Sequence, residues 1–248
     1  MKKIGIVGGL AWPSTVEYYS ELCRRAKHCD ASGGLEISIE SLDLAKSVSY
    51  FGVDGDEVSW LQFDEYHRRA LQRLEAGGAE VACVASNTPH HRFENIVKGI
   101  GIPVISILDA VASECVRMGL RHVMLLGTAL TMNSQTFRSG FSKYGIAARC
   151  PVETHVQAAI VELIADLQRN RREGAADRLH RLAASAFGGH PGERPTVCLA
   201  CTELPLAFED TERLATFERD GIVYVNANVV HVNAVFHAAL GDAERGAS

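Results

Sequence analysis

The sequence predicts an α/β fold of two pseudo-symmetric lobes, each a mainly parallel sheet flanked by helices. Three observations lead to this prediction: short β-rich runs alternate with amphipathic stretches, two of the runs end in related sequences, and the composition is that of a globular chain. The chain has 248 residues, of which 47% are hydrophobic and 22% are charged. A chain of this length and composition can bury a substantial core.

Seven runs have the composition of strands, and most are separated by stretches with apolar residues at three- and four-residue spacing. Strands are expected at 3–9, 35–42, 79–86, 102–107, 122–128, 195–201 and 221–226. Helices are expected at 14–27, 60–77 and 160–169, and at 225–240, where the chain is expected to return to the first lobe. Such alternation is typical of parallel sheets covered on both faces.

One short sequence pattern occurs twice. CVAS at 83–86 is similar to CLAC at 198–201, and this alignment places Ser86 opposite Cys201. Gly8 precedes Ser86 by 78 residues, and Gly127 precedes Cys201 by 74. Two landmarks in the same order predict two related halves, with chance recurrence as the alternative.

The repeat also predicts the domain boundaries. We expect the first lobe to comprise residues 1–105 and 210–248 and the second to comprise 106–209. The active site is expected in the cleft between them.

Composition argues against several classes of partner. The net charge of −5 and the isoelectric point near 6.1 give no indication of nucleic-acid binding, and the basic run at 169–173 is interpreted as a solvated helix face. No stretch approaches the ~20 apolar residues of a membrane span, and no secretory signal is recognised. We therefore expect a cytoplasmic protein that binds neither nucleic acid nor membrane.

The seven cysteines are scattered through apolar segments, which indicates reduced thiols rather than a disulfide framework. Cys198 and Cys201 form a CxxC, but no second ligand pair accompanies it. Adjacent histidines such as His90 and His91 diverge on a turn, so they do not suggest a metal site either. The sequence therefore gives no indication of a metal or a cofactor.

Polar residues follow several of the expected strands and suggest a proton-transfer site. Ser86 and Cys201 are expected on opposite sides of the cleft. Hydrogen-bonding side chains that could hold a carboxylate accompany them, namely Asn87, Thr88, Thr128 and Thr202. Two proton-transfer groups beside a fixed carboxylate suit removal of an α-proton from one face and its return on the other, which is racemisation or epimerisation.

Four segments together resemble the landmarks of the aspartate/glutamate racemase superfamily over nearly the whole chain: GGLAWPST, SNTPHH, LGT followed by TM, and ACTEL. The resemblance implies a cofactor-independent isomerase in which paired cysteines transfer the proton, acting on a small amino acid or dicarboxylate. The family's first cysteine corresponds to Ser86 and its second to Cys201. The CTE form, with Glu203, is similar to the aspartate racemase branch. Relatives often dimerise, which makes a homodimer possible, but no stripe in the sequence indicates the oligomeric state.

The serine changes the expected mechanism. A thiol needs only modest help from turn N–H groups to become a usable base, whereas a hydroxyl is a far weaker acid. Cys201 is therefore expected to act as a thiolate base, and Ser86, or water that it holds, to return the proton. Three alternatives stay open: Ser86 is an introduced substitution, the protein is a decarboxylase or cis-trans isomerase of small dicarboxylic acids using Cys201 alone, or it is a silent paralogue that binds a small acid.

Substrate recognition is less well defined by the sequence. Lys46 is the candidate cation for a second carboxylate, although a surface lysine fits the sequence equally well, and Trp12 is the candidate pocket wall. Cations from the other lobe could come from Arg169, Arg171 or Arg172. His231 occupies the position of a histidine that the family often has near its site, with asparagines in place of the aspartate that usually precedes it. The preferred amino acid and enantiomer are not indicated.

Overall fold

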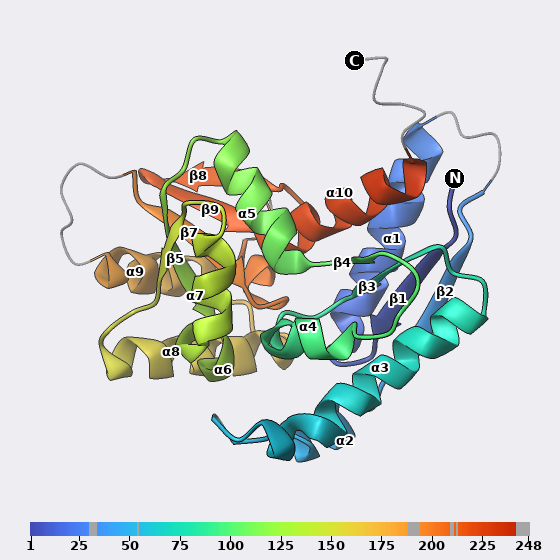
Figure 1. Ribbon diagram of the computed structural model, residues 1–248. Helices are drawn as coiled ribbons and strands as arrows, with labels where there is room; N and C mark the ends of the chain where they lie inside the picture. The colour runs from blue at the N-terminus through green and yellow to red at the C-terminus, as the bar shows by residue number, and fades with distance from the viewer. Residues whose placement is uncertain (30–33, 54, 188–193, 209–210, 212, 242–248) are drawn as a thin grey trace. The chain divides into compact units, whose positions relative to one another are not determined.

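The chain is described by a computed structural model at residues 1–29, 34–53, 55–187, 194–208, 211 and 213–241 (Figure 1). Its internal contacts divide it into two units. The first comprises Met1–Ser106 with His231–Ser248, and the second comprises Ile107–Val230.

The first unit contains a four-stranded parallel sheet in the order β2-β1-β3-β4. Its strands are β1 (Ile4–Gly8), β2 (Ile37–Ser41), β3 (Val81–Val84) and β4 (Val104–Ile105). The residues of β1 and β3 are buried throughout, as expected for central strands covered on both faces.

Helices cover both faces of this sheet. α1 (Trp12–His28) and the second part of α10 (Ala227–Leu240) pack on one face, where Tyr18 and Phe236 join Ile6 in a common core. α3 (Leu61–Ala76) packs on the other face, and it approaches β1 closely at Gly5. The shorter helices are α2 (Leu44–Ser49), η1 (Glu57–Trp60), η2 (Thr88–Arg92) and α4 (Phe93–Ile96).

The second unit contains a five-stranded sheet in the order β6-β5-β7-β9-β8. Its strands are β5 (His122–Gly127), β6 (Ala147–Arg149), β7 (Thr196–Ala200), β8 (Thr216–Arg219) and β9 (Ile222–Asn226). All neighbours are parallel except β8 and β9, which form an antiparallel hairpin.

Two helical layers enclose the second sheet. α8 (Thr154–Gln168) and α9 (Ala175–Ala186) pack on one face, whereas α5 (Ile107–Arg117) and α7 (Gln135–Ser142) pack on the other. The remaining helices are α6 (Ala129–Asn133) and η3 (Leu204–Ala207). Cys198 packs on the α5 side and Cys201 on the α8 side, so the residues of the CxxC serve different layers.

The two sheets share a topology, which confirms the predicted α/β class with parallel sheets. The order β2-β1-β3-β4 of the first matches β6-β5-β7-β9 of the second. Val7 pairs with Val84 in the first sheet, and Leu126 pairs with Leu199 in the second. Because Ser86 and Cys201 each follow the second partner by two positions, the strand register supports the alignment made from the sequence.

The predicted boundary between the lobes differs from the observed division. The sequence analysis assigned 210–230 to the first lobe, but β9 is hydrogen-bonded to β7 and therefore belongs to the second sheet. The chain joins the first unit again only at His231, inside α10. All seven predicted strands are present, whereas β6 and β8 were missed.

Candidate functional site

The predicted site residues all follow the carboxyl ends of strands. Because parallel strands end at a common edge, the segments after β1, β2 and β3 gather at one edge of the first sheet. These segments carry Trp12, Lys46, Ser86, Asn87 and Thr88. The corresponding edge of the second sheet carries Thr128 after β5, and Cys201 and Thr202 after β7.

The turn after β1 is built around two glycines and a threonine. Gly9 has a φ of +83°, a conformation that favours glycine, and its N–H donates to Thr15 Oγ1 at 2.9 Å. A Cβ on Gly8 would lie 2.4 Å from Thr15 Cγ2. The second sheet repeats the arrangement more loosely, because a Cβ on Gly127 would lie 3.2 Å from Thr131 Cγ2.

The segment after β3 presents one half-buried hydroxyl and one buried amide. Among the described residues, the Ser86 hydroxyl has no hydrogen-bond partner. Asn87 is 5% exposed, and its buried Nδ2 has no hydrogen-bond partner in the part of the chain that the structure describes. A buried donor left unpaired costs about 1–3 kcal/mol, so a ligand atom that accepts a hydrogen bond would be favoured at this position.

The buried His90 is hydrogen-bonded to the backbone of this segment. His90 Nδ1 lies 2.9 Å from the carbonyl oxygen of Ser86, and the ring stacks on Phe93. Burial and the neighbouring His231 lower the pKa of His90 to about 3. The imidazole is therefore neutral at physiological pH, and it fixes the backbone of the residue that carries the hydroxyl.

His231 has a structural role in the first unit. Its Nε2 lies 2.8 Å from the carbonyl oxygen of Ile105, which can only accept, so Nε2 carries the proton. Nδ1 then accepts from the Tyr18 hydroxyl at 2.9 Å. Burial lowers the pKa of His231 to about 4, and its side chain is fully buried. This histidine links the start of the returning segment to α1 and to the end of β4.

The segment after β7 places a thiol against a carboxylate. Cys201 Sγ donates to Glu203 Oε2 at 3.0 Å, and Thr202 Oγ1 donates to the same oxygen at 2.9 Å. Gln168 Nε2 donates to Glu203 Oε1 at 3.2 Å. Cys201, Thr202 and Glu203 are each at most 6% exposed. Because a carboxylate only accepts hydrogen bonds, the thiol in this arrangement retains its proton.

We expected from the sequence that Cys201 would form a thiolate readily, but its surroundings oppose this. The backbone N–H groups of Glu203 and Thr202 do lower the pKa of Cys201, as the sequence analysis supposed. Burial and the negative charge of Glu203 outweigh them, and the pKa of Cys201 is raised well above its ordinary value. The free protein therefore holds this cysteine as an acid.

Two asparagines where β9 meets α10 and the hydroxyl of Thr128 lie in the same unit as Cys201 and make the following hydrogen bonds. Asn228 Nδ2 donates to the carbonyl oxygen of Thr202 at 3.2 Å, while the buried Asn228 Oδ1 has no hydrogen-bond partner among the residues described. Asn226 Oδ1 accepts from the N–H groups of Asn228 and Val229 at the start of α10. The Thr128 hydroxyl accepts from the N–H of Thr131, so it caps α6.

The two candidates for substrate recognition are exposed in this structure. Trp12 begins α1 and is 72% exposed. Lys46 is exposed in α2, where Nζ lies 5.2 Å from the centre of the Tyr66 ring. The Asp43 side chain caps the same helix through the N–H of Lys46.

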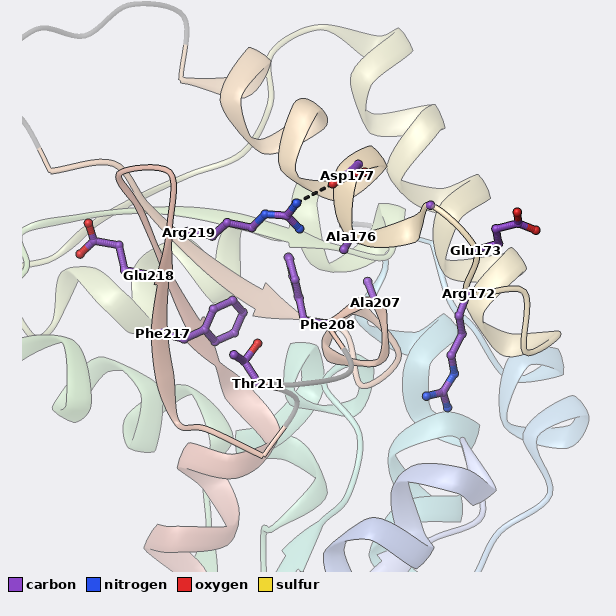
Figure 2. Close-up of a pocket in the computed structure, with 11 residues that line it drawn as sticks. Arg172, Glu173, Ala176, Asp177, Ala207, Phe208, Thr211, Phe217, Glu218 and Arg219 are labelled. Atoms are coloured by element: carbon purple, nitrogen blue, oxygen red, sulfur yellow. Dashed lines mark hydrogen bonds and ion pairs between the residues drawn. The ribbon is translucent and has the colours of Figure 1, made fainter.

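A pocket of about 650 Å³ lies in the second unit (Figure 2). Ala207 and Phe208, which come shortly after Glu203, form part of its wall together with Phe217 of β8. Arg219 faces Asp177 and is ion-paired with it. Arg172 also lines this pocket, whereas Cys201 does not.

The comparisons with known proteins identify the family. The family described as Asp/Glu/Hydantoin racemase matches residues 7–235. The chain belongs to this family. The match spans both sheets and all the segments that carry the predicted site residues, so the resemblance noted in the sequence is confirmed.

Solved structures of this racemase family share the fold. An aspartate racemase homologue from Pyrococcus horikoshii OT3 is 26% identical, with a TM-score of 0.78 over 97% of this chain and 100% of that one. The aspartate racemase of Picrophilus torridus is 22% identical, with a TM-score of 0.69 over 96% and 94%. Glutamate racemase from Campylobacter jejuni subsp. jejuni is 17% identical, with a TM-score of 0.61 over 95% and 85%. These likenesses support the two-lobe racemase fold.

Across the part of the chain that the structure describes, no helix combines the length and the hydropathy needed to cross a bilayer.

Glu203 is the main residue that the sequence analysis failed to assign to the site. It was used there only to recognise the CTE motif, although its position two residues after Cys201 allowed contact. Gln168 and Asn228 were also missed, because contacts between segments this far apart in the chain have no local sequence signal. Only the thiol and the hydroxyl of Thr202 were expected from this cluster.

Proposed function

We propose that this member of the racemase family is a cofactor-independent racemase of aspartate-like or glutamate-like amino acids, in which Cys201 and Ser86 serve opposite faces of the α-carbon. The observation that carries the proposal is the equivalent register of these residues in two sheets of one topology. Each follows a central strand at its carboxyl edge, where α/β folds bind their ligands.

The Cys201 thiol and Glu203 form the first half of the proposed proton transfer. The thiol proton passes to the Glu203 carboxylate, the thiolate removes the α-proton, and an S–H bond replaces the broken C–H bond. The 3.0 Å contact between Sγ and Oε2 allows the first of these transfers without rearrangement. Glu203 thus supplies the base that the raised pKa of Cys201 makes necessary.

The second half returns a proton to the other face. Ser86, whose residue is half-buried and whose hydroxyl has no partner among the described residues, holds a water molecule that protonates the carbanion and becomes hydroxide. Glu203 then releases to solvent the proton that it took from Cys201, and that proton equivalent converts the hydroxide back to water. A serine alkoxide is too basic to form readily, so reaction in the reverse direction starts from hydroxide at this position. The enantiomers have equal free energy, so kcat/KM must be equal in both directions, while kcat and KM can differ separately.

Unpaired buried groups support an amino-acid substrate. Asn87 Nδ2 is a donor that suits a carboxylate oxygen, and Asn228 Oδ1 is an acceptor that suits an ammonium group. Lys46 is the proposed partner of a side-chain carboxylate. Lys46→Met should therefore raise KM for aspartate and glutamate and leave neutral amino acids unaffected.

Exchange of the α-proton in D₂O tests the proposal. Aspartate, glutamate and several neutral amino acids of each hand are incubated with the protein, and the α-proton signal and optical purity are followed. A racemase replaces the proton by deuterium as the opposite enantiomer grows, and Cys201→Ala abolishes both processes. Ser86→Cys should retain or raise turnover, whereas Ser86→Ala should lower it. Substantial activity in Cys201→Ala would contradict the two-group mechanism.

A decarboxylase is the second candidate, because one specific observation favours it. Cys201 holds its proton in the free protein, which suits protonation of a carbanion left when CO₂ departs from a malonate. That reaction needs one acid and leaves Ser86 without a chemical role. Release of CO₂ from substituted malonates, with no exchange in any amino acid, would favour this candidate. Ligand-induced stabilisation with neither reaction would leave a protein that only binds small acids.

A further inference from the structure

A second cavity lies at the other end of the second sheet. It has a volume of about 330 Å³ and is lined where β5 and β7 begin, by His122 and Thr196 among others. Cys201 and Thr128 follow the carboxyl ends of the same two strands. The cavity, called here the β5–β7 entry pocket, is therefore separate from the proposed reaction site. Its volume lies within the range of small-molecule sites.

The walls of the β5–β7 entry pocket are mainly apolar. Met124 contributes from β5, Phe187 from the segment after α9, and Pro195 from the start of β7. Phe187 and Cys150 pack against the core that contains Met124. Val152 also lines the pocket and is 88% exposed, so an apolar surface continues to the opening. A ligand here would gain mainly from burial of an apolar body.

Two arginines give the same pocket an unneutralised positive charge. Arg138 donates to the carbonyl oxygens of Met132 and Asn133 and to Gln135 Oε1, and no carboxylate accepts from it among the described residues. The side chain of Arg149, an exposed residue of β6, has no hydrogen-bond or ion-pair partner in the described part of the chain. These contacts, with one to Cys150 Sγ, engage the guanidinium N–H groups but do not neutralise its charge, so a carboxylate would bind Arg138 by replacing some of them.

We propose that the β5–β7 entry pocket binds a small carboxylic acid with an aliphatic or aromatic body. Arg138 and Arg149 hold the carboxylate, while Met124 and Phe187 contact the apolar part. A carboxylate fits better than a phosphate, because a dianion is strongly hydrated and gains nothing from apolar walls.

Cys150 provides a local readout of occupancy. Its sulfur lies 3.8 Å from Arg138 Nη1 and lines the pocket, and its residue is half-buried. A bound carboxylate should therefore slow alkylation of Cys150 by iodoacetamide. Peptide-resolved mass spectrometry distinguishes this thiol from the other cysteines, so binding at the proposed reaction site does not interfere.

The experiment compares hexanoate and phenylacetate with hexanamide, hexylammonium and inorganic phosphate. Either carboxylate should slow alkylation of Cys150 at least fivefold at saturation, and should reach half of this protection at a concentration at least tenfold lower than hexanamide requires. Equal protection by hexanamide, hexylammonium or phosphate, or no protection by either carboxylate, would overturn the proposal. This comparison uses the unmodified protein and needs no variant to fold.

Variants then test the arginines. Arg138→Gln with Arg149→Gln should weaken hexanoate binding at least tenfold, and Arg149→Lys should retain part of it. Arg121→Gln is the matched control, because Arg121 is exposed in the same unit and does not line the pocket. Unchanged affinity in the double variant, or an equal loss in the control, would also reject the assignment.

Discussion

Cys201 donates a hydrogen bond of 3.0 Å to the carboxylate of Glu203, and both side chains are buried. This contact changes what the cysteine can do in the free protein. Burial and the nearby negative charge raise the pKa of Cys201, so the thiol can donate a proton at once but needs a partner to accept one. We propose that Glu203 is that partner: its carboxylate accepts the thiol proton, and the resulting thiolate acts as the base.

Replacing Glu203 by glutamine separates its effect on the pKa of Cys201 from its proposed role as proton acceptor. Without the negative charge the pKa of Cys201 should fall, so alkylation of Cys201 at neutral pH should become faster. Racemisation should nevertheless slow by about 10²–10⁴-fold, since the amide cannot accept the thiol proton. The measurements are the pH dependence of alkylation at the Cys201 peptide and kcat in the exchange assay.

Glu173→Gln is a suitable control for this variant, because Glu173 is exposed in the same unit. It should leave both measurements unchanged. An unchanged or slower alkylation rate in Glu203→Gln would show that the carboxylate does not control the thiol. Faster alkylation with undiminished racemisation would show that Glu203 takes no part in proton transfer.

Gly127→Ala should damage the second unit through one backbone contact. A Cβ at this position would lie 2.6 Å from the carbonyl oxygen of Ala200, directly before Cys201. Since a backbone atom cannot move aside cheaply, β5 and β7 must separate, and we expect a loss of about 1–3 kcal/mol in the free energy of unfolding. Urea denaturation measures it.

Activity of Gly127→Ala should fall more than stability alone explains, because the displaced strand carries Cys201. Gly34→Ala is the control, since a Cβ there meets nothing within 4 Å. Equal denaturation midpoints for Gly127→Ala and the unmodified protein would contradict the close packing of the two strands.

Much of the fold follows from local sequence patterns, whereas strand β6 does not. β6 consists of Ala147–Arg149, which has neither β-branched nor aromatic residues, so only its pairing with β5 makes it a strand. β8 could have been found. Asp220 and Gly221 both have positive φ, and Asp-Gly between β-rich runs is a strong hairpin signal. Recognising this hairpin would also have placed 216–226 in the second unit.

The candidate site could be predicted as a set of segments but not as a set of contacts. Ser86, Asn87, Cys201 and Thr202 were found because each follows a strand, and strand ends are visible in the sequence. The protonation of Cys201 depends on its burial and on the orientation of Glu203, neither of which a motif encodes. The buried pairing of Asn228 with Thr202 joins segments that only the folded chain brings together.

Asn87→Leu should separate stability from function. Asn87 Nδ2 is buried and has no partner within the described residues, so an apolar side chain of similar shape should leave the melting temperature unchanged or raise it. If this amide binds the substrate carboxylate, kcat/KM should fall at least tenfold. Calorimetry and the exchange assay make the two measurements. A large loss of stability would mean that Asn87 is needed for folding, and retained activity would mean that substrate does not use the amide.

Three buried histidines should make the first unit sensitive to acid. Burial lowers the pKa of His67 and of His231 to about 4, and that of His90 to about 3. In the unfolded chain each histidine has a pKa of about 6.5, so below that pH the unfolded state binds more protons than the folded state. Stability is therefore full above pH 6.5 and falls as the pH drops from 6.5 toward 4. The loss per histidine by pH 5 is about 2 kcal/mol.

The three histidines all belong to the first unit, so its amides should lose protection from hydrogen exchange before those of the second unit as the pH falls from 7 to 5. Exchange rates must be corrected for their intrinsic pH dependence. Each histidine that is replaced should reduce the effect, and His67→Phe, which gives up the contacts to Phe63 and Ser47, tests one of them. Loss of protection in both units at the same pH would contradict this assignment, because the second unit would then carry an equal share of the acid sensitivity.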